Sequence, residues 1–363
     1  MNKISSIKIG NKTVGENKPC YVIAEVGSNF DGSLARAKKL AKLAKDSGAD
    51  AFKIQNFIAE KIVSNRGFKD LKISFQSNWD KPVVEVYKKA EFPRKWIKNL
   101  KEYCDKIDIE FLSSPYDMEA VDLLDSIGVK AFKIGSGEID NLDFLKHVAK
   151  KKKPIIIGCG SSTFKEVTLA INTIKKAGNN KIVLLQCVTN YPSPVAEANL
   201  RAMQVFRKKF TVNVGYSDHT IGMKGGGDDP LNGITVPLGA VAMGAVMLEK
   251  HFSDDVKRKG PDHPFAMEVA EFKKMIDSIR ALEKAFGDGK KRIMPSEKET
   301  YKIQRRGIYA KSKIKRGSKI KKIDLEFLRP AISLRPPEYV KVVGKVAKHD
   351  IESGEPIYLK DVH

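Results

Sequence analysis

The sequence lacks any long apolar run, because nowhere in its 363 residues do about 18 apolar residues follow one another, as a membrane-spanning helix requires. The first twenty residues, MNKISSIKIGNKTVGENKPC, also lack the continuous apolar segment of a secretion signal. We therefore expect no association with a membrane.

Cysteine is scarce, and no two cysteines form a CxxC pair that would suggest a redox or zinc site. The four are Cys20, Cys104, Cys159 and Cys187. Three of them lie in or beside apolar runs, as reduced structural thiols do. This pattern predicts a cytoplasmic protein.

Acidic residues are too few to balance the basic ones, with 44 Asp and Glu against 66 Lys and Arg and a net charge of +22. Such a charge suits a nucleic acid, small anionic ligands or simply a lysine-rich proteome. Proteins that bind nucleic acids concentrate their charge in an arm or on one helix face. Here the lysines are spread over many helix-like stretches without a nucleic-acid motif, so we expect no nucleic-acid partner.

From Tyr21 onward, short apolar runs alternate with amphipathic stretches. Eight runs are typical of strands: YVIAEVG (21–27), AFKIQ (51–55), IEFLSS (109–114), AFKIGS (131–136), PIIIGCG (154–160), IVLLQCV (182–188), VNVGYS (212–217) and AVMLEKHF (245–252). Most of these runs are separated by stretches whose apolar residues recur at helical spacing, as in SLARAKKLAKLAKDSG (33–48). Eight such units predict an α/β fold, a (β/α)₈ TIM barrel over residues 1–287. An open doubly wound sheet is the alternative, but the first strand lacks a glycine-rich dinucleotide turn after it.

The composition changes after residue 287. We expect a linker at residues 288–303 and a separate, mostly-β domain at residues 304–363, which has many β-branched residues, turn glycines and prolines but no long helical pattern. A domain of this size is marginally stable alone and gains from packing on a barrel or a partner chain.

Polar residues gather at the carboxyl ends of the predicted strands, where a (β/α)₈ barrel has its active site. Lys53, Lys133, several serines and glycine turns together suit a phosphate group. His219 and His251 each follow an apolar run, and two imidazoles with carboxylates nearby suit a divalent metal ion. Taken singly, each of these residues has a simpler interpretation, as a side chain that faces solvent or as a polar group satisfied in the core. Together they predict an enzyme that acts on a phosphorylated small molecule.

The stretch IAEVGSNFDGSLARAKKLAKLAKDSGADAFKIQNF resembles the opening of the sialic acid synthases. FLSSPYD, AFKIGSGEIDN, NYPSP, GYSDHTIG, LEKHF and GPDH then follow in that family's order. The tail, with RRGIYAKSKIKRG, LRP and VVGKVAKHDIESGEPI, resembles the family's C-terminal antifreeze-like (SAF) domain. The resemblance implies condensation of phosphoenolpyruvate with N-acetylmannosamine or a related acetamido sugar. The products would be N-acetylneuraminate, or a related nonulosonic acid, and phosphate released by C–O cleavage.

The resemblance also implies roles for individual residues. The catalytic carboxylates would be Glu25 and Glu138, with Glu25 assigned to the water that adds at C2. Phosphoenolpyruvate would be bound by Lys53, Ser114, Lys133, Ser136, Asn190 and Ser217. The sugar would contact Gln55, Tyr191, Asp262 and Arg329, and the metal, Mn²⁺ or Mg²⁺, would be held by His219 and His251. Since the family's equivalent of Arg329 enters the barrel of the other subunit, the resemblance implies a homodimer with exchanged SAF domains.

Several positions depart from the family pattern. Phe30 and Gln186 stand where histidines are common, and IIIGCGSS replaces a serine–threonine–glycine turn, with Ser161 or Ser162 as a substitute hydroxyl. The stretch MKGGGDDPLNGIT (223–235) is an insertion between the two histidines, and it is either a lid or sugar contact or a tolerated surface loop. RPAISLRPPEY in the tail leaves room for a diacetamido sugar.

Two other functions stay open from the sequence alone. One is a different phosphoenolpyruvate-using aldol synthase that acts on an aldose phosphate, and the SAF-like tail argues against it. The other is a non-catalytic, carbohydrate-binding relative, and the presence of Glu25, Lys53, Lys133 and both histidines argues against it.

Overall fold

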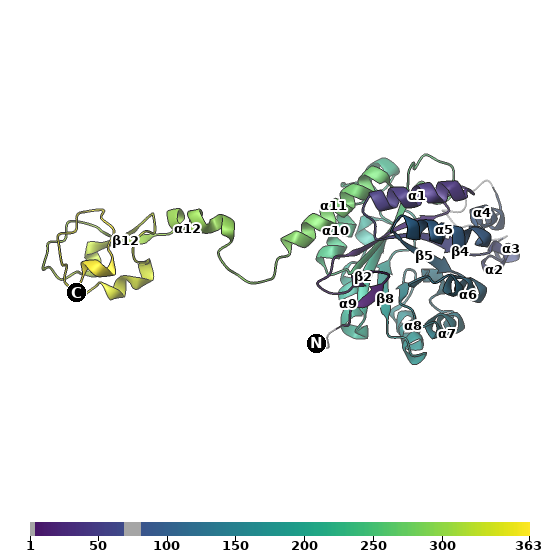
Figure 1. Ribbon diagram of the computed structural model, residues 1–363, viewed down its shortest axis with the longest axis horizontal. Coiled ribbons are helices and arrows are strands. Elements are labelled where there is room, and N and C mark those ends of the chain that lie inside the picture. Colours follow the sequence, from purple (N-terminus) through teal and green to yellow (C-terminus); the bar gives the residue numbers. More distant parts are fainter. Residues whose placement is uncertain (1–3, 69–80) are drawn as a thin grey trace. The chain divides into compact units, whose positions relative to one another are not determined.

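The computed structural model describes residues 4–68 and 81–363 of the chain (Figure 1). The chain divides into two compact units, Met1–Phe286 and Gly287–His363. Within the described ranges, no helix combines the length and the apolar character that crossing a membrane requires.

The first unit is a parallel barrel of eight strands, as the alternating pattern predicted. The strands are β3 (Tyr21–Gly27), β4 (Ala51–Asn56), β5 (Glu110–Pro115), β6 (Phe132–Ile134), β7 (Ile155–Gly158), β8 (Ile182–Cys187), β9 (Asn213–Asp218) and β10 (Met247–Ser253). Their hydrogen-bonded order is β5-β4-β3-β10-β9-β8-β7-β6. Because β5 and β6, at the two ends of this order, also contact each other, the barrel is nearly closed. The predicted fold class is confirmed.

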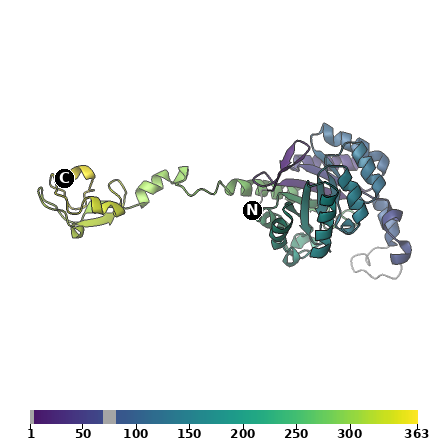
Figure 2. The same cartoon turned by 90° about the horizontal axis from the view of Figure 1, so that it is seen from below.

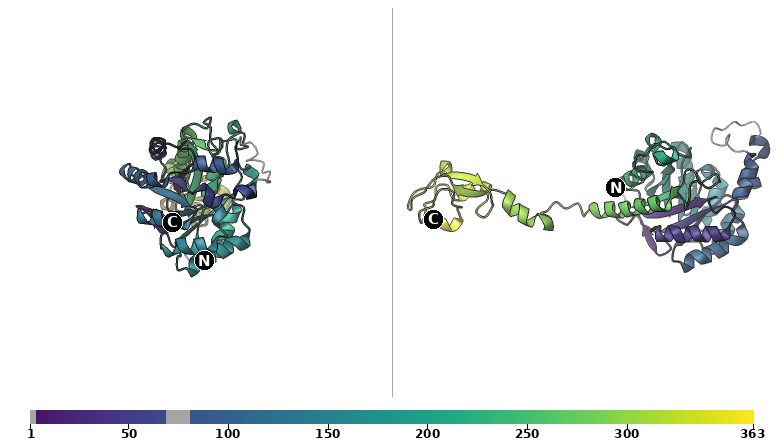
Figure 3. Two further views of the ribbon diagram at one scale, coloured as in Figure 1. Left: turned by 90° about the vertical axis from the view of Figure 1, so that its right-hand side faces the viewer. Right: turned by 90° about the horizontal axis from the view of Figure 1, so that it is seen from above.

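Helices cover the outside of the barrel, as Figure 2 and Figure 3 show from other directions. They are α1 (Leu34–Asp46), α5 (Arg94–Lys106), α6 (Met118–Ser126), α7 (Leu142–Lys150), α8 (Phe164–Lys176), α9 (Arg201–Phe210), α10 (Thr235–Ala242) and α11 (Val269–Ala285). α1 shows why the sequence forms them, since Ala37, Leu40, Ala41 and Ala44 recur at helical spacing and are all buried. The strands have helices on one side and barrel interior on the other, so their sequences are continuously apolar rather than alternating.

An N-terminal hairpin, which the sequence did not predict, packs on the amino-terminal part of the barrel. Its strands are β1 (Ile7–Ile9) and β2 (Lys12–Val14), paired antiparallel. Ile7, Ile9 and Val14 form one buried cluster with residues near the starts of the barrel strands, such as Tyr21 and Ala51. The opposite, carboxyl ends of the strands carry the polar side chains described below.

Three short helices lie between β4 and α5: α2 (Ala59–Ile62), α3 (Asn65–Phe68) and α4 (Val83–Ala90). Phe57, at the end of β4, contacts Tyr87 of α4 and Tyr116 beyond β5, with ring centroids 5.7 and 5.8 Å apart. These contacts hold α4 beside the carboxyl ends of β4 and β5.

The loop after β9, which we interpreted from the sequence as an insertion, is anchored by a buried carboxylate. Asp229 is fully buried and accepts hydrogen bonds from the backbone N–H of Leu231 at 2.8 Å and of Thr235 at 3.0 Å. It also accepts one from the Thr235 hydroxyl at 2.7 Å. Thr235 is the first residue of α10, so the insertion satisfies the start of that helix.

The second unit has a core of its own, which includes Ile308, Ile320, Val342 and Ile357. Its elements are α12 (Lys298–Gln304), the antiparallel pair β12 (Gly307–Ala310) and β13 (Leu325–Leu328), and several single 3₁₀ turns. This composition agrees with the predicted mostly-β domain, and most of α12 falls within the segment expected as a linker, residues 288–303.

Candidate active site

Two lysines and two glutamates form a buried cluster inside the carboxyl end of the barrel. Lys53 of β4 lies 2.5 Å from the Glu25 carboxylate of β3 and 3.7 Å from Glu249 of β10. Lys133 of β6 donates to Glu249 at 3.0 Å. All four side chains are buried, so the strands bring together two opposite pairs of charges in a space that excludes water. Such charges persist only because they compensate one another.

The electrostatics of this cluster make its two carboxyl groups different. Burial tends to raise the pKa of Glu249, but Lys133 and Lys53 outweigh it and lower that pKa to about 2. Burial raises the pKa of Glu25, against the attraction of Lys53. For Lys133, burial would lower the pKa, yet the Glu249 carboxylate outweighs it and raises the pKa. Glu249 is therefore a fixed anion, while Glu25 is the carboxyl group better suited to exchange protons.

Hydroxyl groups surround the lysines. Ser114 of β5 accepts from Lys53 at 3.1 Å, and Ser217 of β9 donates to Glu249 at 3.0 Å. Ser136, just after β6, accepts from the backbone N–H of Gly160 at 3.0 Å and lies 3.2 Å from the Cys187 sulfur. Hydroxyl groups in the same part of the barrel as two ammonium groups are the composition of an anion site.

Gly158, at the end of β7, lies against Ser136. A Cβ atom at position 158 would lie 2.7 Å from the Ser136 hydroxyl, so a side chain there would require that hydroxyl to move. Ser161 and Ser162, the expected substitutes, bond instead to the Thr189 hydroxyl and to the Gly160 carbonyl.

The two histidines lie together, with ring centroids 5.5 Å apart. His219 Nδ1 donates to the Val188 carbonyl at 2.5 Å, which fixes its tautomer and leaves Nε2 as the electron-pair donor. His251 Nδ1 is buried and, in the described part of the chain, has no hydrogen-bond partner. Burial lowers the pKa of both imidazoles, that of His219 to about 4 and that of His251 well below its ordinary value. Both are therefore neutral, as metal ligands must be.

The donor set fits a divalent metal ion only in part. Between residues 4 and 68 and from 81 onward, no group of three or more His, Cys, Asp or Glu side chains is arranged to hold one. Two neutral imidazoles would leave the remaining coordination positions to water and substrate oxygens, as catalytic metal sites do. The orphaned nitrogen of His251 is the local feature that a ligand would satisfy.

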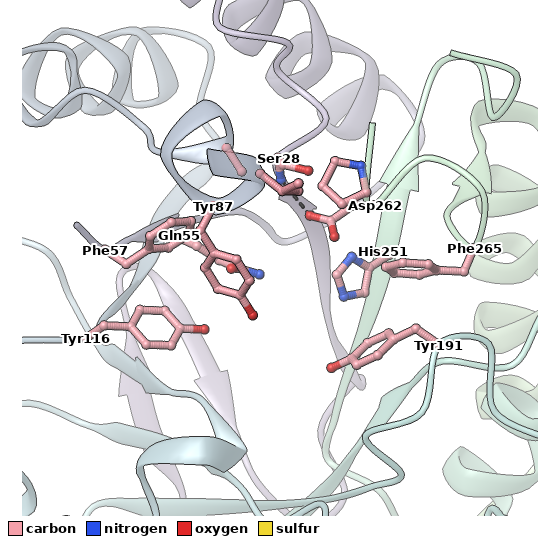
Figure 4. Close-up of a pocket in the computed structure, with 12 residues that line it drawn as sticks. Ser28, Gln55, Phe57, Tyr87, Tyr116, Tyr191, His251, Asp262 and Phe265 are labelled. Carbon is pink, nitrogen blue, oxygen red and sulfur yellow. Dashed lines mark hydrogen bonds between the residues drawn. The ribbon is translucent and has the colours of Figure 1, made fainter. Parts of the chain in front are cut away.

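A cavity of about 200 Å³ opens beside these histidines (Figure 4). It is lined by Ser28, Gln55, Phe57, Val86, Tyr87, Ala90, Tyr116, Tyr191, His251, Pro261, Asp262 and Phe265. Figure 4 shows His251, Tyr191 and Phe265 on one side and Phe57, Tyr87 and Tyr116 facing them on the other. Tyr191 packs on His219, with ring centroids 4.2 Å apart. Gln55 connects the cavity to the charge cluster by donating to Glu25 at 2.9 Å.

Asp262 is seated against the loop after β3. Its carboxylate accepts from the Ser28 backbone N–H at 2.7 Å, and burial raises its pKa. The next residue, His263, is fully buried, with its ring nitrogens 2.9 Å from the Ser253 hydroxyl and 2.8 Å from the Asp31 carboxylate. This network fixes Asp262 at the edge of the cavity (Figure 4).

Two expected site residues of the barrel make other contacts, and a third belongs to the second unit. Asn190 is exposed and donates to the Pro192 carbonyl at 2.8 Å. Glu138 is half-buried in the 3₁₀ turn after β6, where burial raises its pKa against a hydrogen bond with Asn141. Arg329 belongs to the second unit and is exposed there, so its sugar contact stays a prediction.

The two positions without the family's histidines have structural roles. Phe30 is fully buried and packs on Phe92, with ring centroids 4.8 Å apart. Gln186 is buried and donates to the Ala198 carbonyl at 3.2 Å.

Comparisons with known proteins agree with this geometry. The model of the NeuB family matches residues 40–291, and that of the SAF domain matches residues 305–363. The chain belongs to the NeuB family.

Several proteins resemble this NeuB-family chain over most of its length. The N,N'-diacetyllegionaminic acid synthase of Campylobacter jejuni is 40% identical over 341 residues, which are 93% of this chain and 98% of that protein. The synthase of the same name from Legionella pneumophila is 38% identical over 352 residues, 95% of each chain. The crystal structure of N-acetylneuraminic acid (sialic acid) synthetase from Leptospira borgpetersenii, in complex with citrate, matches with a TM-score of 0.71. It is 32% identical and covers 83% of this chain and 96% of that one. The resemblance to sialic acid synthases is confirmed.

Some residues of this NeuB-family site were not assigned from the sequence. Glu249 is the clearest, since it contacts Lys53, Lys133 and Ser217. The sequence signal that could have identified Glu249 is its position two residues before His251, because alternate residues of a strand face the same side. The aromatic side of the cavity, from Phe57 and α4, had no comparable signal, because it lies outside the repeating strand-and-helix pattern.

Proposed function

We propose that the chain catalyses a metal-dependent condensation of phosphoenolpyruvate with an acetamido sugar and water. The products would be a nonulosonic acid and phosphate. The observation that carries this proposal is the buried cluster of Lys53, Lys133 and serine hydroxyls beside a cavity that presents His251. That arrangement offers one site for a small, highly charged anion and an adjoining one for an uncharged sugar. Membership of the NeuB family supports it.

Phosphoenolpyruvate would bind at the lysines. Lys53 and Lys133 would donate to its phosphate and carboxylate oxygens, with Ser114, Ser136 and Ser217 completing the hydrogen bonds. In the structure both lysines are neutralised by Glu25 and Glu249, so the anion would compete with these carboxylates for the same ammonium protons. Asn190 was assigned to the same substrate, but its place in an exposed turn gives this assignment no support.

His219 and His251 would hold the metal ion, Mn²⁺ or Mg²⁺. When bound, such an ion supplies Lewis acidity at the aldehyde of the open-chain sugar. The neutral state of both rings and the free Nδ1 of His251 support this assignment. Tyr191 and Phe265 pack against the rings and limit their rotation.

Bond formation joins C3 of phosphoenolpyruvate to C1 of the sugar and leaves an alkoxide at the former aldehyde oxygen. Water adds at C2 and gives one proton to a carboxylate, which passes it to that alkoxide. The C2–O bond to phosphate then breaks, C2 becomes a ketone, and the second proton of the water leaves with the phosphate. Glu25 is our choice for that carboxylate, because burial raises its pKa and it lies beside Lys53 in the cluster. Lys53 and Lys133 would stabilise the charge of the departing phosphate.

The sugar would occupy the cavity. Gln55, Tyr191 and Asp262 line it and offer an amide, a phenol and a carboxylate to sugar hydroxyl and acetamido groups. Arg329, contributed by the SAF domain of a second subunit, would complete this contact in a homodimer. The four cysteines are free and buried, which fits a reducing compartment, so we place the reaction in the cytoplasm.

An aldose phosphate is a poor fit for this cavity. Among the described residues that line it there is no lysine or arginine, so a second phosphate group would have no cationic partner. A non-catalytic, carbohydrate-binding function does not explain why two lysines are paired with two carboxylates at the barrel mouth.

The test is release of phosphate from phosphoenolpyruvate in the presence of Mn²⁺ and unphosphorylated acetamido sugars. Glu25→Gln should lower kcat by about 10²–10⁴, as loss of a general base does. Glu138→Gln serves as the matched control and should have the smaller effect. The assignment of Glu25 is wrong if its variant keeps near-normal turnover while the Glu138 variant loses it.

A further inference from the structure

The loop after β8 forms an arch over His219. At one end of the arch the Val188 carbonyl accepts from His219 Nδ1, and near the other end the Ser193 N–H donates to the His219 carbonyl at 3.0 Å. Between these two points Tyr191 packs on the His219 ring, with centroids 4.2 Å apart, and faces the cavity (Figure 4). We call residues 188–195 the tyrosine arch. Its position determines where Tyr191 lies.

Tyr191 contacts both of the histidines assigned to the metal ion. Its ring centroid lies 5.8 Å from that of His251 as well as 4.2 Å from that of His219. Phe265 packs on Tyr191 and His251, with centroids 4.9 Å from each. Side chains that contact metal ligands orient them, and so set the geometry that the ion meets. A shift of Tyr191 would therefore change the packing on both imidazoles.

A side chain from the loop after β9 holds the far end of the tyrosine arch. The Asp228 carboxylate accepts from the Val195 N–H, at 2.9 Å to one oxygen and 3.1 Å to the other. Val195 begins a single 3₁₀ turn, and Pro194 before it offers no side-chain cap. Asp228 therefore caps this turn from another loop, as an N-cap side chain caps a helix.

The backbone that presents Asp228 is itself fixed. The Asp229 N–H donates to the Ile221 carbonyl at 3.2 Å, and the buried Asp229 carboxylate bonds to the start of α10. Asp228 is exposed, and in the part of the chain that the structure describes its side chain bonds to Val195 alone. The loop after β9 is thus connected to the tyrosine arch through one carboxylate.

We infer that Asp228 is a positioning residue, which fixes the tyrosine arch and so keeps Tyr191 packed on the two imidazoles. This inference rests on the proposed function, in which His219 and His251 hold the metal ion. Asp228 does not line the cavity, so it acts through Tyr191 rather than on a substrate. The loop after β9 thereby supports the metal-binding end of the site.

The expected effect is modest, because the bonds of Val188 and Ser193 to His219 still hold the rest of the arch. Loss of a capping side chain shifts a local equilibrium by roughly 2–30-fold. We expect Asp228→Ala to open the arch, and to weaken Mn²⁺ binding, within about this range.

Hydrogen exchange and metal titration test these two steps separately in the full-length chain. Deuterium uptake by a peptide that spans residues 188–200 should be faster in Asp228→Ala, because the Val195 N–H loses its acceptor. Titration calorimetry with Mn²⁺ alone should show a Kd raised several-fold. Asp228→Asn keeps an oxygen acceptor and should lie between the unaltered chain and Asp228→Ala in both measurements.

Two further variants show whether the effect depends on Tyr191. Asp288→Ala removes another carboxylate that accepts from a backbone N–H, that of Lys290 at 3.1 Å, and should change neither measurement. Tyr191→Ala should itself weaken Mn²⁺ binding. Adding Asp228→Ala to Tyr191→Ala should weaken it no further, because the ring that the arch positions is gone.

The contrary outcomes are distinguishable. Equal deuterium uptake in the 188–200 peptide overturns Asp228 as the residue that holds the arch. Faster uptake with unchanged Mn²⁺ affinity, or additive losses of affinity in the double variant, overturns its positioning role. These results leave the proposed function standing. If the unaltered chain binds neither Mn²⁺ nor Mg²⁺, the proposed metal-dependent function fails, and the inference fails with it.

Discussion

At the scale of single residues, Glu249 sets the electrostatic state of the site. Its carboxylate accepts from both Lys133 and Ser217 at 3.0 Å and lies 3.7 Å from Lys53. With Glu25, it balances two buried ammonium groups. In the proposed reaction, an anionic substrate would compete with these two carboxylates for the lysines.

Glu249→Gln tests this balance through the pH dependence of stability. The pKa of Glu249 is about 2 in the folded chain against an ordinary 4.5, so the unfolded chain binds more protons between these values. Its contribution to stability is thus complete above pH 4.5 and is lost as the pH falls toward 2. The glutamine variant leaves two lysines poorly paired and should be destabilised by about 3–5 kcal/mol near pH 6.

Urea denaturation of both chains at about pH 6 and pH 3.5 measures the difference. The difference in the free energy of unfolding between the two chains should shrink by roughly 1–2 kcal/mol at the lower pH, because only the unaltered chain loses the Glu249 contribution there. A difference that is the same at both pH values would mean that Glu249 is not held ionised by the lysines.

At the scale of elements, an ion pair ties β9 to β10 next to the two histidines. Asp218 and Lys250 are register partners in β9 and β10, their side chains are bonded, and both are buried. Each stands one residue before a histidine and therefore faces the other side of its strand. Lys250 also donates to the Thr220 carbonyl at 2.5 Å, which fixes the turn that follows His219.

Lys250→Met should destabilise the chain by about 3–5 kcal/mol, since it leaves Asp218 buried without its cation. It should also weaken Mn²⁺ binding by displacing the two imidazoles relative to each other. Chemical denaturation measures the first effect and titration calorimetry with Mn²⁺ the second. Lys273→Met, which removes the exposed Lys273–Asp277 pair of α11, is the control and should cost less than about 1 kcal/mol. An equally small cost for Lys250→Met would contradict the role of this pair.

How far the sequence predicts each element depends on how strongly burial shapes its pattern. The eight barrel strands could be predicted because both of their faces are covered, which leaves continuous apolar runs such as IIIG in β7. The hairpin of β1 and β2 could not, because two three-residue strands show too little periodicity. The sequence predicted that His219 and His251 lie together, because each follows an apolar run that is typical of a strand. The aromatic side of the cavity could not be found, because Phe57, Tyr87 and Tyr116 are far apart in the sequence and meet through tertiary packing.

At the scale of the whole molecule, each unit has a core of its own. The barrel packs Phe52, Phe111 and Phe132 between strands and helices, whereas the second unit packs Ile308 and Val342 with its own residues. The two units therefore do not depend on each other for a hydrophobic core. The expected role of the second unit is instead to deliver Arg329 to the site of another subunit.

Mixed dimers test that role. Glu25→Gln and Arg329→Ala chains should each have low activity alone, because each homodimer lacks one residue at both sites. After co-refolding in equal amounts, activity should recover to about a quarter of the unaltered level, since half of the dimers would each contain one intact site. Sedimentation should show dimers throughout. Sedimentation as a monomer, or no recovery in verified mixed dimers, would contradict domain exchange.

Asp229 gives the insertion after β9 a consequence for protein engineering. Because this one carboxylate bonds to Leu231 and Thr235, residues of this loop supply the start of α10. The loop and the helix therefore form one exchangeable module. A graft that transfers the loop should carry α10 with it, and a trimmed loop should retain Asp229.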